Sequence, residues 1–261
     1  MVEAPGYYPL FSKLEMAHIK LIPWARSINP DLYQLETILE KRKPKILFFQ
    51  PYAHNPTGGS MSEKIVDEIC EICHRHQTIV VIDDPFAHIL NNSHAYWPHA
   101  IYLSSFSKTL SASLRCGYVI ADEHCINSLL KLKTVTMVNT SAFNEAILYD
   151  IMISGKYEQH LCALKQHLSA QAAATLATLG ELKPILKISP YSDGLYLWVK
   201  LPSHISDMQL AEKSAKAGIF LSPGKLFYPA ASPYPALRLN VAYSADNRLV
   251  TFLRQQLINT A

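Results

Sequence analysis

Short apolar runs alternate with amphipathic stretches along the first half of the chain, and this alternation indicates the fold class. Four runs have the length and composition of buried strands, at residues 45–50, 78–82, 101–104 and 118–121. The segment from Ser62 to His76 places apolar residues at helical spacing between the first two runs. Alternating strands and helices with short connections predict an α/β fold, a three-layer arrangement built on a mostly parallel sheet.

The second half of the chain has a different pattern. From about residue 126 to 179 it is helical and rich in alanine, with a break near Gly155. After Gly180 the predicted elements are strands at 195–199, 219–221 and 237–241 and helices at 207–217 and 246–257. We therefore predict a large α/β domain at residues 1–157 and a smaller α+β domain at residues 158–261.

The composition describes a chain with ample core material. Of its 261 residues 49% are hydrophobic and 17% are charged, which fits one large domain or a medium domain with a smaller partner. The net charge is only +3 and the basic residues are scattered, so the sequence predicts no nucleic-acid contact by this chain itself. The one basic run, at residues 41–43, ends a helical pattern and is typical of a solvated helix C-terminus.

The five cysteines are irregularly spaced and predict free thiols rather than a disulfide framework. Residues 70–74 spell the C-x-x-C-H pattern of haem attachment, but helical periodicity explains Cys70 and Cys73 as packing residues. Neither a signal-peptide pattern nor an apolar run of membrane-spanning length is present, and the histidines form no metal-ligand spacing. The sequence therefore predicts a cytoplasmic chain with no membrane segment and no metal.

The segment Ser105-Phe106-Ser107-Lys108 places a lysine at the exit of an apolar strand, and Arg115 follows soon after. We expect the lysine to lie in a partly buried turn, where an amine loses its proton more easily than at the surface. A neutral lysine amine condenses with an aldehyde to form a Schiff base, and hydroxyls with a guanidinium suit a phosphate. An aldehyde and a phosphate on one small molecule describe pyridoxal 5′-phosphate.

Three more polar residues lie at or within predicted strands, and each has two interpretations. Asn55, in Asn-Pro-Thr-Gly, belongs to a simple turn or donates an amide hydrogen bond to a ring oxygen. Asp83 caps the next turn or pairs with a protonated pyridine nitrogen, and as the acid nearer the strand it is preferred over Asp84. Arg238 lies inside an apolar strand and either pairs with an acidic neighbour or holds a substrate carboxylate.

These motifs follow one another in a fixed order, and together they are specific. The chain resembles fold-type I enzymes of the class I/II aminotransferase family over essentially its whole length, lacking the N-terminal segment of the family's large domain. Within that family it is most similar to two groups, the aminotransferase-like domain of MocR/GntR-type transcription regulators and the 2-aminoadipate-type aminotransferases. The motifs that carry the resemblance are Asn55-Pro56-Thr57-Gly58, Asp83, Ser105-x-x-Lys108, Arg115-x-Gly117-Tyr118 and Arg238.

The resemblance implies a role for each matching residue toward pyridoxal 5′-phosphate. Lys108 would form the Schiff base and shuttle a proton, and Asp83 would hold the pyridinium. Asn55 would bind the phenolic oxygen of the cofactor and lie near the substrate. Ser105 and Arg115 would bind the phosphate.

Three further positions complete the implied site. Tyr7, next to Tyr8, matches the aromatic residue that stacks on the pyridine ring, and Arg238 matches the residue that binds the substrate carboxylate. Phe86 departs from the family, which usually has a tyrosine there whose hydroxyl also binds the phenolic oxygen. The loss of that hydroxyl is expected to weaken turnover more than cofactor binding.

The resemblance implies a cytoplasmic homodimer that binds an amino acid or a 2-oxo acid. We expect the chain to be the effector-sensing part of a MocR/GntR-type transcription regulator, with residues that could support amino-group transfer. The alternatives are a free-standing amino-acid aminotransferase and a vestigial interaction module that binds no pyridoxal 5′-phosphate.

Overall fold

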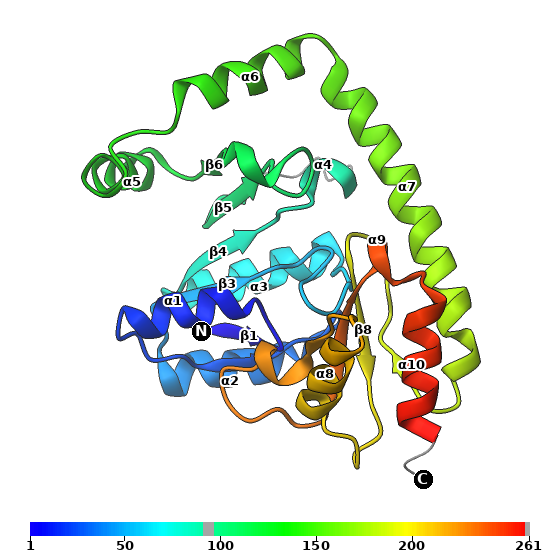
Figure 1. The fold of residues 1–261 in the computed structure, drawn as a ribbon. Helices are drawn as coiled ribbons and strands as arrows, with labels where there is room; N and C mark the ends of the chain where they lie inside the picture. Colours follow the sequence, from blue (N-terminus) through cyan, green and yellow to red (C-terminus); the bar gives the residue numbers. More distant parts are fainter. Residues whose placement is uncertain (91–96, 259–261) are drawn as a thin grey trace. The chain divides into compact units, whose positions relative to one another are not determined.

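A computed structural model describes residues 1–90 and 97–258 of the chain (Figure 1). Two compact units can be recognised. The first unit comprises residues 1–30, 53–60 and 167–261, and the second unit comprises residues 31–52 and 61–166. The boundary predicted between residues 157 and 158 falls in the first turn of helix α7 (Lys156–Leu179), and as a domain boundary it stays a prediction.

The second unit contains a sheet with the strand order β3-β4-β5-β6. Its strands are β3 (Ile46–Phe49), β4 (Ile79–Asp83), β5 (Ala100–Ser105) and β6 (Gly117–Ile120). The first three strands run parallel and β6 is antiparallel to β5, so the predicted mostly parallel α/β sheet is confirmed. Leu47, Val80 and Ile82 are fully buried, as expected for strands covered on both faces.

The helices of the second unit include the one predicted at residues 62–76 and others. They are α2 (Leu32–Arg42), α3 (Glu63–Arg75), α4 (Ala87–Leu90), α5 (Glu123–Thr136), α6 (Ala142–Ile153) and the start of α7. The hydroxyl of Ser62 accepts a hydrogen bond from the Ile65 amide and so begins α3 where the sequence predicts it. Cys70 and Cys73 lie buried on the inner face of α3, and burial raises the pKa of each thiol to about 12. Both cysteines are therefore packing residues.

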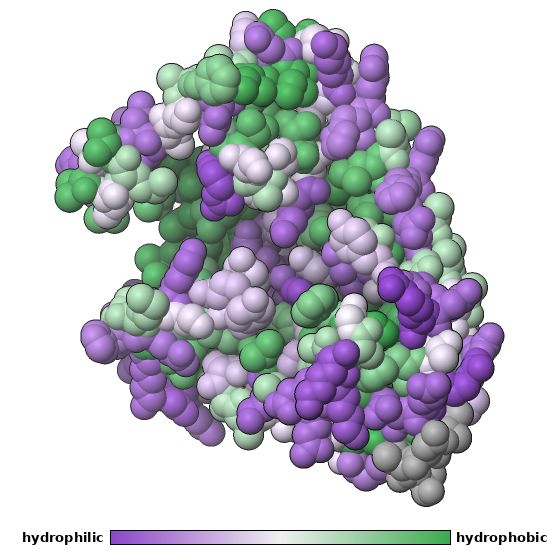
Figure 2. All heavy atoms as spheres, viewed as in Figure 1, coloured by the Kyte–Doolittle hydropathy of each residue, from purple (hydrophilic) through white to green (hydrophobic). Residues whose placement is uncertain are grey.

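The helical stretch predicted from residue 126 to 179 is three helices rather than two. Gly155, with φ of +70°, separates α6 from α7 as expected, and a further break lies between α5 and α6. Neither α5 nor α6 has a buried residue. Large apolar side chains are instead exposed along both helices, including Leu132, Val135, Phe143, Tyr149 and Ile153. Figure 2 shows apolar side chains at the surface over this part of the chain.

The first unit contains a parallel pair and a second sheet. Strands β1 (Val2–Ala4) and β2 (Pro23–Ala25) pair in parallel. The antiparallel sheet has the order β7-β8-β10-β9, with β7 (Lys187–Ile188), β8 (Tyr196–Lys200), β9 (Ser222–Pro223) and β10 (Ala236–Asn240). The helices are α1 (Tyr8–Met16), α8 (Asp207–Lys216), α9 (Val241–Ser244), α10 (Asn247–Ile258) and most of α7. This α+β organisation matches the prediction for the C-terminal part.

One predicted strand is wrong. Residues 219–221 are not a strand, and the pairing with β10 begins only at Ser222. Gly218 adopts a left-handed conformation after α8, and Phe220 extends into solvent with 89% of its surface exposed. The apolar run therefore follows the helix as a connection in which Phe220 is exposed and Ile219 and Leu221 are half-buried, instead of pairing within the sheet.

Among the described residues, none of the helices is both long and apolar enough to cross a membrane.

Candidate functional site

The two adjacent acids after β4 have different surroundings. Asp84 is fully buried, where it accepts hydrogen bonds from the Tyr102 hydroxyl at 3.1 Å and the Phe86 amide at 3.3 Å. Asp83 is only partly buried and accepts a 2.6 Å hydrogen bond from the Gln50 side-chain amide. Because successive side chains of a strand point to opposite faces, only one acid can serve a ligand at this strand end. Asp84 has a structural role, and Asp83 is the acid that remains accessible.

Lys108 lies in the turn that follows β5, and its side chain is exposed. The expected partial burial of this lysine is therefore wrong. Its neighbours Phe106 and Thr109 are buried instead, so the turn is anchored on both sides while the amine extends outward. No hydrogen-bond or ion-pair partner for the Lys108 side chain occurs in the part of the chain that the structure describes. The amine is accessible to an aldehyde.

An aromatic cluster beneath the turn holds it in place. The Phe106 ring packs against His88, Tyr118 and Tyr157, with centroids 5.5 to 6.0 Å apart. The Tyr157 hydroxyl also donates a 2.8 Å hydrogen bond to the buried Thr109 hydroxyl. Burial lowers the pKa of His88, whose Nε2 lies 3.1 Å from the Tyr118 hydroxyl. The sequence did not reveal His88 and Tyr157, because no motif marks contacts between residues that are so distant in the sequence.

Strand pairing brings two predicted phosphate ligands into one neighbourhood. Ser105 pairs with Gly117 in the antiparallel register of β5 and β6, and Arg115 lies two residues before that glycine. A Cβ atom at Gly117 would lie 2.7 Å from the carbonyl oxygen of Ser104, so only glycine fits this close approach. Arg115 is exposed and left-handed, with φ of 52°, and its Nη1 makes one long contact of 3.5 Å to the Ala112 carbonyl. Its guanidinium is available to an anion.

Asn55 and Arg238 form the polar centre of the first unit. Arg238 Nη1 donates to Asn55 Oδ1 at 3.1 Å, and Nη2 donates to the Ser222 hydroxyl at 3.3 Å. A guanidinium can only donate, so the Asn55 atom that faces it is the oxygen, and the Asn55 amide NH₂ is directed elsewhere as a donor. The guanidinium also lies over the rings of Tyr196 and Phe227, at 4.5 and 5.0 Å from their centroids.

These contacts decide between the two interpretations of Arg238. Its hydrogen bonds go to neutral oxygens, and no carboxylate of the described residues pairs with it. A partly buried arginine that lacks a charged partner retains donors for an external carboxylate. The acidic-neighbour interpretation is wrong for the described part of the chain.

The loop that carries Asn55 is a tight turn, as its composition predicts. Gly58 has φ of +71°, and a Cβ atom there would lie 2.1 Å from the carbonyl oxygen of Tyr196. Glycine is therefore required for the turn to pack against β8. The turn also places Asn55, only 6% exposed, beside Arg238, so the turn interpretation and the ligand interpretation are compatible.

Two aromatic positions complete the comparison with the sequence. Tyr7 precedes α1 and is 40% exposed, with its ring 6.4 Å from that of Tyr8. Tyr8 packs edge-on against Phe227, the ring that also faces Arg238. Phe86 is 1% exposed and lies in the core of the second unit.

The side chains of the second unit fit pyridoxal 5′-phosphate. An accessible carboxylate, an exposed amine, a strand-end hydroxyl and an exposed guanidinium match its pyridine nitrogen, aldehyde and phosphate. Within the described residues, no group of three or more histidine, cysteine, aspartate or glutamate side chains is arranged to hold a metal ion.

A mostly parallel α/β sheet with this donor set at its strand ends is the arrangement expected of an aminotransferase-like chain of the pyridoxal-phosphate-dependent class. The model of the family "Aminotransferase class I and II" matches residues 1–254, and the chain belongs to this family. The resemblance inferred from the sequence motifs is thereby confirmed, and the family supports pyridoxal 5′-phosphate as the cofactor.

Curated relatives include both enzymes and regulators. The chain is 26% identical over 95% of its length to aromatic-amino-acid aminotransferase 1 of Thermococcus litoralis, of which it covers 63%. It is 28% identical over 78% of its length to the HTH-type transcriptional regulator YdfD of Bacillus subtilis, of which it covers 44%. The chain thus spans less than two thirds of the length of these relatives.

A solved structure shows the same fold. LysN, the α-aminoadipate aminotransferase of Thermus thermophilus, was crystallised with N-(5′-phosphopyridoxyl)-L-leucine. It is 22% identical to this chain, and the superposition has a TM-score of 0.87 and covers 100% of this chain and 72% of LysN. The chain is an aminotransferase-like domain.

Proposed function

We propose that this chain is a pyridoxal-phosphate-binding domain that senses an amino acid or a 2-oxo acid as the effector part of a MocR/GntR-type transcription regulator. Similarity to HTH-type regulators such as YdfD supports this role. The observation that carries the proposal is the Asn55–Arg238 pair, because it presents guanidinium donors without a charged partner to a ligand carboxylate.

In this proposal four residues would hold the cofactor. Lys108 would supply the amine that condenses with the aldehyde with loss of water, and Asp83 would keep a proton on the pyridine nitrogen. Ser105 and Arg115 would bind the phosphate through a hydroxyl and a guanidinium. When bound, pyridoxal 5′-phosphate supplies an electron sink that stabilises negative charge at the carbon bearing the amino group.

By resemblance to the family, Asn55 would bind the phenolic oxygen of the cofactor. Its Oδ1 accepts from Arg238, so the Asn55 amide NH₂ is the group that would donate to that oxygen. Arg238 binds the α-carboxylate through its remaining donors. Tyr7 is assigned to the ring face by resemblance, and Tyr8 contributes to the wall around Phe227.

Phe86 favours sensing over efficient turnover. The family's usual tyrosine would bring a hydroxyl to the phenolic oxygen, and Phe86 is a buried apolar ring with no such group. Cofactor binding depends on several other residues and is expected to persist, while proton transfer loses one contributor. Amino-group transfer between an amino acid and a 2-oxo acid is expected to be slow. A homodimer and a cytoplasmic location are part of the proposal.

Absorbance spectroscopy of the purified chain tests the proposal. Wild type mixed with pyridoxal 5′-phosphate is expected to show a visible band that is fixed covalently by borohydride, and Lys108→Ala is expected to lack both. Lys13→Ala, on α1, is the matched control for removal of a lysine. Identical spectra for wild type and Lys108→Ala would disprove the assignment.

The free-standing aminotransferase is the second candidate, and similarity to aromatic-amino-acid aminotransferase 1 favours it. Stopped-flow spectra after addition of amino acids separate the two functions. Conversion of the bound cofactor to its amine form at rates typical of enzymes, about 1 s⁻¹ or faster, supports the enzyme. A spectral change on binding, without that conversion, supports the sensor.

A further inference from the structure

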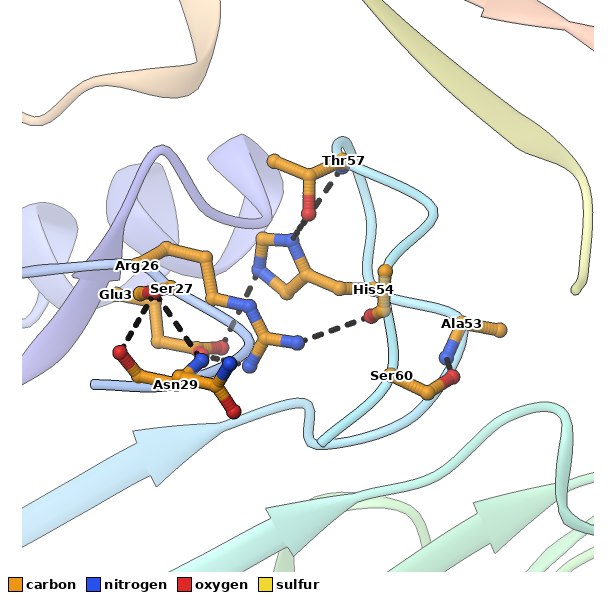
Figure 3. A network of polar contacts seen from close by, with 9 residues as sticks. Glu3, Arg26, Ser27, Asn29, Ala53, His54, Thr57 and Ser60 are labelled. Carbon is orange, nitrogen blue, oxygen red and sulfur yellow. Dashed lines mark hydrogen bonds and ion pairs between the residues drawn. The ribbon is translucent and has the colours of Figure 1, made fainter. Parts of the chain in front are cut away.

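Four side chains of the first unit form a buried polar network beside the loop that carries Asn55 (Figure 3). Glu3 Oε1 accepts a 2.7 Å hydrogen bond from Arg26 Nη1, and both side chains are almost fully buried. The other oxygen of Glu3 lies 3.3 Å from His54 Nε2, and His54 has no exposed surface. His54 Nδ1 lies 2.8 Å from the Thr57 hydroxyl. The chain of contacts therefore leads from β1 and from Arg26, directly after β2, into the loop at residues 53–60.

The contacts of His54 define the state of its imidazole. The Thr57 amide donates toward Nδ1 at 3.4 Å, so Nδ1 acts as an acceptor. The ring proton then belongs on Nε2, where it faces the Glu3 carboxylate. Burial lowers the pKa of His54, although Glu3 opposes this effect. Burial therefore favours the neutral imidazole at His54, and the charges of Glu3 and Arg26 compensate each other.

The network clamps the two residues that flank Asn55-Pro56. His54 precedes this dipeptide and Thr57 follows it, and the imidazole bridges them. The backbone closes the same turn, since the Gly58 amide donates to the His54 carbonyl at 2.7 Å. Arg26 adds a third attachment through a 3.0 Å hydrogen bond from Nη2 to the Gly59 carbonyl. Little freedom remains for the backbone of Asn55.

We propose that Glu3, Arg26, His54 and Thr57 are positioning residues that fix Asn55 as the acceptor of Arg238. The Glu3–Arg26 pair holds His54, the imidazole holds Thr57, and the closed turn presents Asn55 Oδ1 to the guanidinium. Arg238 is thereby kept in the orientation that a carboxylate needs, before any ligand arrives. The consequence for ligands rests on the proposed function, whereas the effect on Arg238 does not.

Thr57→Val is the most direct test, because it removes the hydroxyl at nearly constant shape. Thr57→Ser keeps the hydroxyl and is the rescue variant. Thr178→Val removes a threonine hydroxyl that bonds only to its own helix, at the Ala174 carbonyl, and is the matched control. Urea unfolding of all three proteins measures how far each change acts through stability alone.

The decisive readout is the hydrogen exchange of the Arg238 guanidinium. It is measured by NMR on the cofactor-free protein, and its signals are assigned with Arg238→Lys. Thr57→Val is expected to speed this exchange about tenfold, which corresponds to about 1.4 kcal/mol. Thr57→Ser and Thr178→Val are expected to stay within about twofold of wild type. An unchanged Arg238 exchange in Thr57→Val would overturn the proposal, whatever its effect on unfolding.

Two further measurements separate this proposal from the proposed function. Nitrogen-15 shifts of His54, assigned with His54→Asn, are expected to report the Nε2–H tautomer, and an Nδ1–H tautomer would contradict the clamp. Pyridoxal 5′-phosphate is expected to bind Thr57→Val more weakly than Thr57→Ser. If wild type binds no cofactor, the proposed function fails, and the Arg238 exchange still decides whether Thr57 positions the pair.

Discussion

The Asn55–Arg238 pair and the Lys108 turn are prepared for ligands in opposite ways. Asn55 is 6% exposed, and the Arg238 guanidinium has two hydrogen-bond partners and two aromatic rings around it. Lys108 and Arg115 are exposed, and their side chains make a single contact of 3.5 Å within the described residues. The backbone of the turn is anchored by Phe106, but its functional side chains are not held.

This difference predicts which side chains lose conformational entropy when a ligand binds. A side chain that is fixed before binding loses little conformational entropy when it meets a ligand, whereas a mobile lysine or arginine loses up to about 2 kcal/mol. Under the proposed function, carboxylate recognition by Arg238 would therefore be preorganised. Phosphate and aldehyde recognition by Arg115 and Lys108 would have to order those side chains at the moment of binding.

The largest effect is expected when Arg115 is removed. Arg115→Ala loses a charge-assisted contact to the phosphate, and such contacts contribute about 1.5 to 3 kcal/mol, so cofactor affinity is expected to fall about 100-fold. Because the side chain is exposed, the urea midpoint is expected to stay unchanged. Titration of absorbance and urea unfolding measure the two quantities, with Arg42→Ala as the surface control. A large loss of stability would mean that Arg115 is held in the free protein after all.

A smaller effect is expected at Arg238, and it concerns the stability of the ligand-free protein rather than cofactor affinity. Arg238→Lys keeps the charge but loses the planar fork and its fit over Tyr196 and Phe227. The free energy of unfolding is expected to fall by about 1 kcal/mol even without any ligand. Arg248→Lys, at an exposed pair with Asp246, is the control and is expected to be neutral. Equal stability of Arg238→Lys and wild type would show that the pair is not preformed.

A third effect concerns pH and the network behind Asn55. Because burial lowers the pKa of His54, the folded protein binds fewer protons there than the unfolded chain does below about pH 6.5. The contribution of His54 to the free energy of unfolding is complete above the pKa of the unfolded state, and it is lost as the pH falls toward the lowered pKa of the folded state. The free energy of unfolding then falls by at most about 1.4 kcal/mol per pH unit. Urea unfolding at pH 7.5 and 5.5 is expected to show a steeper loss for wild type than for His54→Asn. Parallel pH dependences would contradict a buried neutral His54.

The sequence predicted those features that depend on local pattern. Strands β3, β4 and β5 lie within two residues of their predicted bounds, because continuous apolar runs indicate buried parallel strands. Helix α3 followed from the helical spacing of its apolar residues, and the Ser62 hydroxyl caps its first turn. The same local reasoning failed at residues 219–221, where an apolar run forms a connection rather than a strand after the left-handed Gly218.

Features that depend on distant contacts could not be predicted. The Glu3–Arg26–His54 network joins residues 51 positions apart, and none of the three belongs to a recognisable motif. The exposure of Lys108 follows from the burial of Phe106 and Thr109 against His88 and Tyr157, which motif reading does not reveal. The motifs thus indicate which residues matter, while their state in the free protein is decided by packing.

Order parameters of the arginine Nε–H groups, measured by nitrogen-15 relaxation, test the contrast between the two regions most directly. In the cofactor-free protein Arg238 is expected to be ordered, near 0.85, and Arg115 to be mobile, below about 0.6. Addition of pyridoxal 5′-phosphate is expected to raise the value for Arg115 and to leave that for Arg238 unchanged. An Arg238 that becomes ordered only with the cofactor, or an Arg115 that is ordered without it, would contradict the account.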